Sequence, residues 1–294
     1  MNFEELAEYH VEQDADLTIA TIPVNAHDAP GFGIMKVNEQ AMIESFIEKP
    51  QPDVLSEWQS AVSDDLRAEG KIYLASMGIY IFKKEVLHGL LDEDPDAIDF
   101  GKEIIPAAIN SGMREASFAF NGYWTDIGTI SSFFDANIAL TDAVPQFNLF
   151  DNVKYIYTRP RMLAPSKVFG TWFNQAILAD GCIINAKKIE RAIIGIRSRI
   201  GNNTEISKGV IMGNDFYETI EDITRHEGIP MGIGENCHIE NAITDKNCRI
   251  GNDVIIRGGN SLENTETDTY CIRDGIVVVK KGAVIPHGSR IGEV

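Results

Sequence analysis

The sequence contains none of the signals that would send the chain into a membrane or along a secretory route. No uninterrupted apolar run approaches the roughly 18 residues of a bilayer-spanning helix, and the acidic start, Met1 to Glu5, has no apolar signal-peptide core. Basic residues are few: the chain has 26 Lys and Arg and 44 Asp and Glu, which gives a net charge of −18. This balance argues against nucleic-acid and membrane-surface partners. We therefore expect a soluble, cytoplasmic protein in which local Lys, Arg or backbone N–H groups hold any anionic ligand.

Cysteines are also few, and no two of them show a Cys-x-x-Cys spacing. The four are Cys182, Cys237, Cys248 and Cys271. Buried thiols are therefore favoured over a metal site or a disulfide framework.

A six-residue repeat of aliphatic residues runs through the second half of the chain. A helix repeats every 3.6 residues and a strand every two, so this period is typical of the hexapeptide repeats of a parallel β-helix rather than of ordinary Ile-rich strands. The residues expected in the bore of the helix are Ile183, Ile189, Ile194, Ile200, Ile206, Ile233, Ile239 and Ile250. The residues expected at its positive-φ corners are Asn202, Asn203, Asn236, Asn247 and Asn252.

Strands alternate with helices in the first half, which predicts an α/β domain with a mixed sheet. The predicted strands are 17–24, 32–37, 42–47, 72–82 and 116–120, and the predicted helices are 3–13, 85–91, 101–110 and 129–140. We expect three parts: a domain over 1–145, a linker over 146–168, and the β-helix over 169–294. Residues 215–230 interrupt the hexads and should protrude as a loop.

Two short segments have the residue types of a site for an anionic sugar. Glu48-Lys49-Pro50 places a carboxylate and an ammonium at a predicted strand end, where Glu can accept from hydroxyls and Lys can hold a phosphate. A surface ion pair is the alternative interpretation. Trp124 and Asp126 lie in a loop that opens a helix at Gly128-Thr129, where Asp could bind a metal. A helix cap beside a packed Trp is the alternative there.

Taken together, these segments resemble one family. Its motifs are Gly33, Glu48-Lys49-Pro50, Ala75-Ser76-Met77-Gly78-Ile79-Tyr80, Asp99-Phe100-Gly101, Gly122-Tyr123-Trp124-Thr125-Asp126-Ile127-Gly128-Thr129, Arg159-Pro160-Arg161, Pro165-Ser166-Lys167, Met212-Gly213-Asn214-Asp215-Phe216-Tyr217-Glu218 and Gly232-Ile233-Gly234. In order and spacing the chain is similar to ADP-glucose pyrophosphorylase (glucose-1-phosphate adenylyltransferase). The fold that this resemblance implies is a nucleotidyltransferase domain with a Rossmann-like mixed sheet, followed by a left-handed parallel β-helix.

The resemblance also implies a reaction and its residues. The family transfers AMP from ATP to glucose 1-phosphate with Mg²⁺, giving ADP-glucose and pyrophosphate for glycogen or starch synthesis. The residues implied for the glucose 1-phosphate pocket are Gly33, Glu48, Lys49, Ser76 and Trp124. Lys49 would grip the sugar phosphate, and Asp126 would be a metal ligand and a catalytic residue.

The resemblance further implies a homo- or hetero-tetramer and an anionic sugar-phosphate activator. The cations implied for the activator are Arg159, Arg161, Lys167 and Lys281. If they bind one phosphate ester, Arg161, Lys167 and Lys281 should converge in the folded chain. Solvated surface charges without a ligand are the alternative.

The departures from the family pattern concern ATP. The family's Gly-x-Gly-x-Arg-Leu-x-Pro-Leu-Thr loop is not found in this sequence, and Met1-Asn2-Phe3 falls where relatives carry a second metal-binding aspartate. We therefore expect a chain that lacks roughly the N-terminal third of the family and is inactive alone, through a truncated gene model, a split gene or a degenerate copy.

Other functions stay open. A catalytically silent regulatory or assembly subunit of the same family is one alternative, and a guanylyltransferase for mannose 1-phosphate is another. A hexapeptide acyltransferase is disfavoured, because His226, His238 and His287 lie in no recognisable acyltransferase context.

Overall fold

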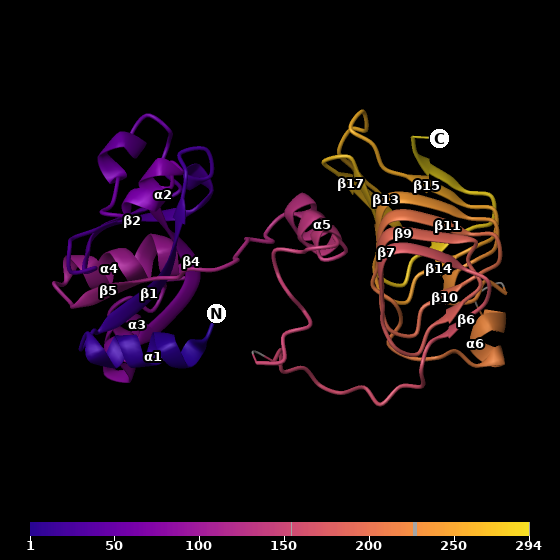
Figure 1. Ribbon diagram of the computed structural model, residues 1–294, viewed down its shortest axis with the longest axis horizontal. Helices are drawn as coiled ribbons and strands as arrows, with labels where there is room; N and C mark the ends of the chain where they lie inside the picture. The colour runs from indigo at the N-terminus through magenta and orange to yellow at the C-terminus, as the bar shows by residue number, and fades with distance from the viewer. Residues whose placement is uncertain (154, 226–227, 294) are drawn as a thin grey trace. The chain divides into compact units, whose positions relative to one another are not determined.

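The chain forms two compact units. The computed structural model describes residues 1–153, 155–225 and 228–293, so His226 lies outside the described residues. The first unit spans residues Met1–Trp124 and the second spans Thr125–Val294 (Figure 1). Within the described residues, no helix has both the length and the apolar character that crossing a membrane requires.

A mixed five-stranded sheet forms the centre of the first unit. Its strands are β1 (Leu17–Val24), β2 (Gly33–Val37), β3 (Ile43–Glu48), β4 (Tyr73–Phe82) and β5 (Glu115–Ala119), in the order β3-β2-β4-β1-β5. Only the β1–β5 pair is parallel, and β2 and β3 form the predicted hairpin. All five strands confirm the sequence prediction within two residues.

Helices cover both faces of this sheet. They are α1 (Phe3–Glu12), α2 (Asp64–Ala68), α3 (Lys84–Glu93) and α4 (Ile105–Asn110), with 3-10 turns at Ala29–Gly31 and Leu55–Trp58 and a π-helical turn at Phe100–Ile104. On one face Leu6 of α1 packs against Ala20 and Met77. On the other face, Ile105 of α4 and Leu90 of α3 belong to the main core of the unit.

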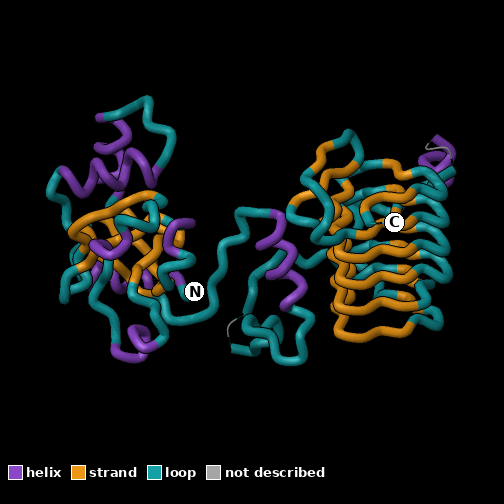
Figure 2. Tube along the Cα trace, turned by 90° about the horizontal axis from the view of Figure 1, so that it is seen from above, coloured by secondary structure: helices purple, strands orange, loops and turns teal. Residues whose placement is uncertain are grey.

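The second unit is a parallel β-helix, as its six-residue repeat predicts (Figure 2). Its six-stranded sheet contains β6 (Lys167–Val168), β8 (Ile183–Ile184), β10 (Arg199–Ile200), β12 (Gly232–Ile233), β14 (Arg249–Ile250) and β19 (Val284–Ile285). The other sheet contains β7 (Trp172–Leu178), β9 (Lys188–Ile194), β11 (Glu205–Ile211), β13 (His238–Thr244), β15 (Ile255–Arg257), β16 (Thr265–Glu266), β17 (Tyr270–Arg273), β18 (Ile276–Val279) and β20 (Arg290–Gly292).

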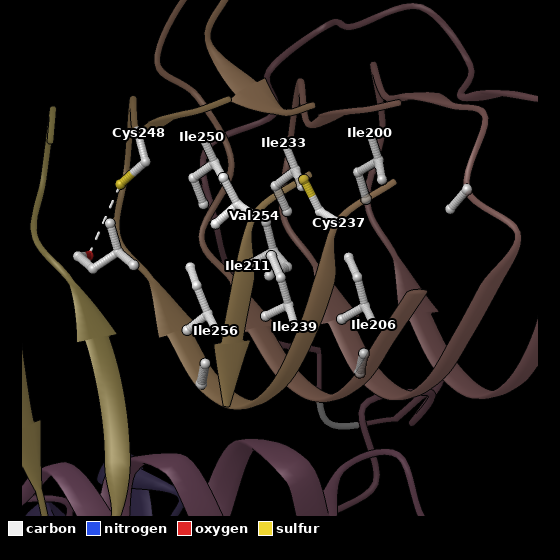
Figure 3. Packing of buried hydrophobic residues seen from close by; sticks show 14 of the residues in the cluster. Ile200, Ile206, Ile211, Ile233, Cys237, Ile239, Cys248, Ile250, Val254 and Ile256 are labelled. Atoms are coloured by element: carbon white, nitrogen blue, oxygen red, sulfur yellow. Dashed lines mark hydrogen bonds between the residues drawn. The ribbon is translucent and has the colours of Figure 1, made fainter. Parts of the chain in front are cut away.

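The predicted bore is confirmed at all but one position. Buried isoleucines from successive coils stack in it, as Figure 3 shows for Ile206, Ile239 and Ile256. Ile183 was expected inside but is 40% exposed, whereas its neighbour Ile184 is fully buried. Successive strand residues point to opposite faces, and Ile184 is the residue in register with buried Ile200. Cys182, Cys237 and Cys248 are also buried in this core, as free thiols.

The corners of the coils differ in part from the prediction. Asn203, Asn236 and Asn247 have positive φ as expected, but Asn202 and Asn252 do not. A second set of positive-φ residues lies at the fourth position of each seven-residue strand: Gln175, Arg191, Lys208 and Asn241. The strand bends there, so each long strand supplies two sides of the coil. The set was not predicted from the sequence, because three of its four side chains, those of Gln175, Arg191 and Lys208, are not typical of positive φ.

Helix α5 (Ile130–Ala139) belongs to the second unit. Its Phe134 and Ile138 pack on Val210, Ile243 and Ile276 of the β-helix. The compact units therefore divide at residue 124, whereas the sequence placed the end of the first domain at 145. The difference arises because the apolar face of this helix covers the outer wall of the β-helix.

The interrupting segment 215–230 contains the short helix α6 (Ile220–Arg225) and lies at one corner of the β-helix (Figure 1). Its anchor is the ion pair of Glu218 with Arg249, whose side chains are 7% and 6% exposed. Glu218 also accepts from the N–H of Met231, and Arg249 donates to the carbonyl of Ile229. These contacts attach the predicted loop to the β-helix.

Candidate functional site

The start of β2 and the end of β3 bring the first two predicted site residues together. Gly33 and Glu48 are opposite each other in this antiparallel ladder. A Cβ built on Gly33 would lie 2.8 Å from Oε2 of Glu48 and 2.4 Å from the ring of Phe46. Glycine is therefore required for this close approach, whereas its φ is not in the left-handed region.

Lys49 follows directly and has a strained backbone, with φ at +48°. Its N–H donates to the carbonyl of Phe32 at 3.0 Å, and its Nζ lies 3.8 Å from Oε1 of Glu48. The Lys49 side chain is 64% exposed and that of Glu48 is 26% exposed, so the ammonium remains accessible to a ligand. Non-glycine residues in the left-handed region are frequent at ligand sites.

An irregularity in β4 places Ser76 near Tyr80. Between the pairs Ile19↔Tyr80 and Thr21↔Ser76, β4 has three residues where β1 has one, and the φ of Gly78 is +70°. The Ser76 hydroxyl accepts from the N–H of Gly78 at 3.2 Å and lies 3.4 Å from the Tyr80 hydroxyl. Bulges of this kind redirect side chains beside active sites.

Tyr80, Asp99 and Phe100 complete the cluster, and none of them was predicted from the sequence to have a role in it. The Phe100 ring stacks on Tyr80 with centroids 5.8 Å apart and planes 10° apart. Burial raises the pKa of Tyr80, a hydrogen bond with Ser76 lowers it, and the charges of Glu48 and Asp99 raise it further. All three residues belong to segments that resemble family motifs, which could have marked them as candidates. The sequence does not show that these segments lie next to Glu48 and Ser76 in the folded chain.

The turn that begins at Asp99 also lies close to the Glu48 carboxylate. Asp99 Oδ1 accepts from the N–H groups of Gly101 and Lys102 at 2.8 and 3.0 Å, which caps the π-helical turn. A Cβ on Gly101 would lie 3.0 Å from Oε2 of Glu48. Two glycines, at 33 and 101, therefore leave room for this one carboxylate.

Trp124 contacts the same unit through Phe32, with ring centroids 5.6 Å apart. It also packs against the cluster of Leu6, Ala20 and Met77. Phe32 thus contacts two predicted site residues, Lys49 through its carbonyl and Trp124 through its ring.

Asp126 lies in the second unit, in the segment before α5. It is exposed, and its Oδ1 accepts from the N–H of Gly128 at 3.2 Å. Among the described residues no group of three His, Cys, Asp or Glu gathers as a metal site. A lone exposed carboxylate still fits Mg²⁺ bound to a nucleotide, because that ion takes one or two carboxylates together with phosphates and waters.

Asn2, which was expected from the sequence to stand in place of a second metal-binding aspartate, has a structural role here. Its Oδ1 accepts from the N–H of Glu4 at 3.1 Å and caps α1, and its Nδ2 donates to Glu5. This amide is thus engaged in starting a helix.

The predicted regulatory cations do not all converge. Arg159 and Arg161 are exposed in the loop before β6, and Lys167 lies in β6 with its Nζ over the ring of Phe169. Lys281 precedes β19, and β6 and β19 are the two edges of the six-stranded sheet. Five strand spacings separate these edges by about 24 Å. The expectation that Lys167 and Lys281 share one phosphate within a chain is therefore wrong.

Lys281 has other charged neighbours. Its Nζ lies 3.9 Å from Oδ2 of Asp215, whose Oδ1 pairs with Lys246 at 2.6 Å. The Lys246 hydrogen bond lowers the pKa of Asp215, with smaller contributions from Asn247 and Lys281. Two ammonium groups thus share one carboxylate at this corner of the β-helix.

Comparison with known proteins identifies both parts of the chain. Residues 1–143 match the nucleotidyl transferase family, and residues 161–289 match the GLGC left-handed parallel β-helix domain. The chain is 41% identical over 302 aligned residues to the glucose-1-phosphate adenylyltransferase small subunit, chloroplastic/amyloplastic, of Triticum aestivum. This alignment covers 99% of the chain and 64% of the relative. The chain is therefore a homologue of the glucose-1-phosphate adenylyltransferase small subunit, with a nucleotidyl transferase domain followed by a left-handed β-helix.

Proposed function

We propose that this chain is a subunit of a glucose-1-phosphate adenylyltransferase, which forms ADP-glucose and pyrophosphate from ATP and glucose 1-phosphate for glycogen or starch synthesis. The observation that carries the proposal is the cluster of Glu48, Asp99, Ser76 and Tyr80 around two glycines, with Lys49 at its edge. Carboxylates and hydroxyls suit the hydroxyls of a sugar, and a single accessible ammonium suits its phosphate.

Each group in the cluster has a distinct part in this proposal. Glu48 and Asp99 accept from sugar hydroxyls, and the rings of Phe100 and Trp124 offer apolar surfaces to the sugar. Lys49 holds the phosphate oxygen that attacks the α-phosphorus of ATP, which aligns two anions that would otherwise repel each other. Mg²⁺ would neutralise phosphate charge when bound, and Asp126 would supply one carboxylate oxygen to it.

Binding of glucose 1-phosphate tests this proposal without any turnover. We expect titration calorimetry of the full chain to detect glucose 1-phosphate, and Lys49→Gln to weaken it at least tenfold, because the phosphate loses its charged partner. Lys71→Gln is the matched control, since the ion pair that Lys71 forms among the described residues is with exposed Glu69 of the same unit. Equal affinities in the parent chain and both variants would reject the assigned site.

Activity of these 294 residues alone is a separate matter. The sequence contains no Gly-x-Gly-x-Arg loop for the ATP phosphates, and Asn2 is engaged as a helix cap. Each such electrostatic element is typically worth several kcal/mol of barrier, so we expect a rate of ADP-glucose synthesis at least about 10⁴ below that of an enzyme with both elements. Family-like rates from the purified chain would contradict this expectation.

A catalytically silent regulatory or assembly subunit is the second candidate, and the engaged Asn2 amide favours it. Under this alternative the chain would raise the activity or the affinity of an active partner in a hetero-tetramer. We propose Lys281, with Lys246 beside it, as its contact for an anionic sugar-phosphate activator. Co-expression with an active subunit, with and without Lys281→Gln, distinguishes this role: a lost activator response with unchanged basal rate supports it.

A further inference from the structure

Glu115, the first residue of β5, is buried without a partner. It is 2% exposed, and within the described part of the chain neither carboxylate oxygen has a hydrogen-bond partner. Buried polar atoms in folded proteins are nearly always bonded, so an exception of this kind calls for an explanation. The proposed sugar site does not use this residue.

Among the described residues, no Lys, Arg or His forms a hydrogen bond with Glu115. It is in register with Leu17, so it points to the same face of the sheet, into the apolar core with Ile105 and Ala108. The titratable groups on the elements around it include Tyr9 and His10 of α1, Asp14 and Asp16 before β1, Glu44 of β3, Lys83 before α3, and Arg114.

Lys83, Asp16 and His10 each bond to a group other than Glu115. Lys83 contacts Asp14 at 2.9 Å and Asp16 at 3.1 Å. The backbone N–H of Arg114 donates to Asp16, and the His10 ring bonds to Thr18 at 2.7 Å. Burial, and then the charge of Asp16, raises the pKa of Glu115 from 4.5 to about 8.

The place of Glu115 in the sheet makes its protonation state consequential. Among the described strands, β5 lies at the edge of the sheet and pairs along its length with β1. On its other side it contacts the segment before β3, through the isolated bridge between Met42 and Ala116 and a hydrogen bond from the N–H of Ser117 to the carbonyl of Ala41 at 2.8 Å. An edge strand can open without unfolding the whole unit. The segment that follows it leads to Trp124.

We propose that Glu115 is a proton-dependent latch: in its neutral form it lets β5 pair on β1, and its ionisation in the apolar core releases β5 and the segment that leads to Trp124. This device concerns the order of one strand and goes beyond the proposed enzymatic function. The latch weakens as pH rises, because closed β5 keeps a proton that the opened strand loses. The loss begins above pH 4.5 and is complete above about pH 8.

Hydrogen exchange of the full chain, followed by mass spectrometry between pH 5 and 8, tests the latch. The exchange rates of amides in peptides covering residues 115–124 are divided by the intrinsic exchange rate of an unprotected amide at each pH. The ratio gives the equilibrium constant for opening of the strand. We expect this equilibrium to shift toward opening by about tenfold per pH unit relative to Glu115→Gln, which cannot ionise. Peptides of β11 in the second unit are the internal control.

The variants make the outcome decisive. Glu115→Asp keeps a carboxyl and should retain a pH dependence, whereas Glu115→Leu should lose it as Gln does. Glu115→Leu also serves if the buried amide of the Gln variant prevents folding. The same pH slope in the parent chain and in Glu115→Leu would overturn the proposal. No sugar ligand is needed, so the result is independent of the proposed reaction.

Discussion

Gly33 and Glu48 face each other across the β2–β3 ladder so closely that a methyl group on Gly33 would lie 2.8 Å from the Glu48 carboxylate. The same methyl group would lie 2.4 Å from the ring of Phe46. The position of the carboxylate that we propose to bind the sugar thus depends on the absence of one side chain. This relationship explains why a glycine is needed at a strand position where glycine otherwise weakens pairing.

Gly33→Ala should therefore impair the pocket and the strand together. Overpacking of this kind costs about 1–3 kcal/mol, and displacement of Glu48 should weaken glucose 1-phosphate binding. Urea unfolding and calorimetric titration measure the two effects. Gly31→Ala is the matched control, because a Cβ there meets nothing within 4 Å. If Gly33→Ala behaves like the control in both measurements, the close approach of Gly33 to Glu48 matters neither for stability nor for binding.

Lys49→Gly should separate stability from binding. The backbone of Lys49 lies in the left-handed region, which disfavours side chains by roughly 1–2 kcal/mol, so glycine should leave the unit as stable as the parent or slightly more stable. Glucose 1-phosphate binding should fall because the ammonium is lost. Lys36→Gly in β2, at an exposed position without positive φ, should instead cost about 0.5–1 kcal/mol. Unfolding midpoints in urea, followed by tryptophan fluorescence, provide the comparison.

The cysteines should differ sharply in reactivity. Burial raises the pKa of Cys248 to about 12 and also raises the pKa values of Cys182 and Cys237. Cys271 is only partly buried. Because the thiolate is the reactive form, a maleimide should label Cys271 first in the folded chain. Mass spectrometry of the labelled protein checks this, and Cys271→Ser should leave the native chain essentially unlabelled until denaturant is added.

The six-residue repeat made the β-helix predictable from the sequence. The candidate site was less predictable, because its residues are brought together only by the folded structure. The hexads identified Ile200, Ile206 and Ile239 as core residues because each coil repeats the same constraint. The repeat predicted the wrong residue at Ile183, because either of two adjacent isoleucines, Ile183 or Ile184, could occupy the inward position, and Ile184 does so. Positive φ at Gln175, Arg191 and Lys208 could not be foreseen, because the coil geometry overrides the preference of the side chain.

For the site, local sequence indicated Glu48 and Lys49 but not their partners. Tyr80 reaches the cluster only through the irregularity in β4, and Asp99 only through the π-helical turn. Both features depend on tertiary packing. The predicted meeting of Lys167 with Lys281 failed for a related reason, because residues far apart in a solenoid sequence lie in different coils.

Asp16 should give the first unit an acid sensitivity opposite in sign to that of Glu115. The Arg114 N–H, and then Lys83, lower the pKa of Asp16 below its ordinary value of 3.8. A lowered folded-state pKa means that the stabilisation is present above the ordinary value and is lost as pH falls below it. Asp16→Asn should therefore destabilise the unit at pH 7 and differ less from the parent at pH 3. Urea midpoints in a Trp172→Phe background report the first unit through Trp58 and Trp124; a constant difference at both pH values would contradict this assignment.

The buried pair of Glu218 and Arg249 should hold the 215–230 segment against the β-helix. Both side chains are under 10% exposed, and each also bonds to the backbone near the end of the segment. Removing one partner leaves an uncompensated buried charge, so Glu218→Leu or Arg249→Met should each cost about 3–5 kcal/mol, whereas the double variant should recover much of the loss. Thermal unfolding of the four proteins forms a double-mutant cycle. Glu221→Ala and Arg225→Ala, an exposed pair in α6, should change stability by no more than about 0.5 kcal/mol. Additive losses in the Glu218 and Arg249 cycle would show that the two charges do not depend on each other, and that contacts other than this ion pair fasten the segment.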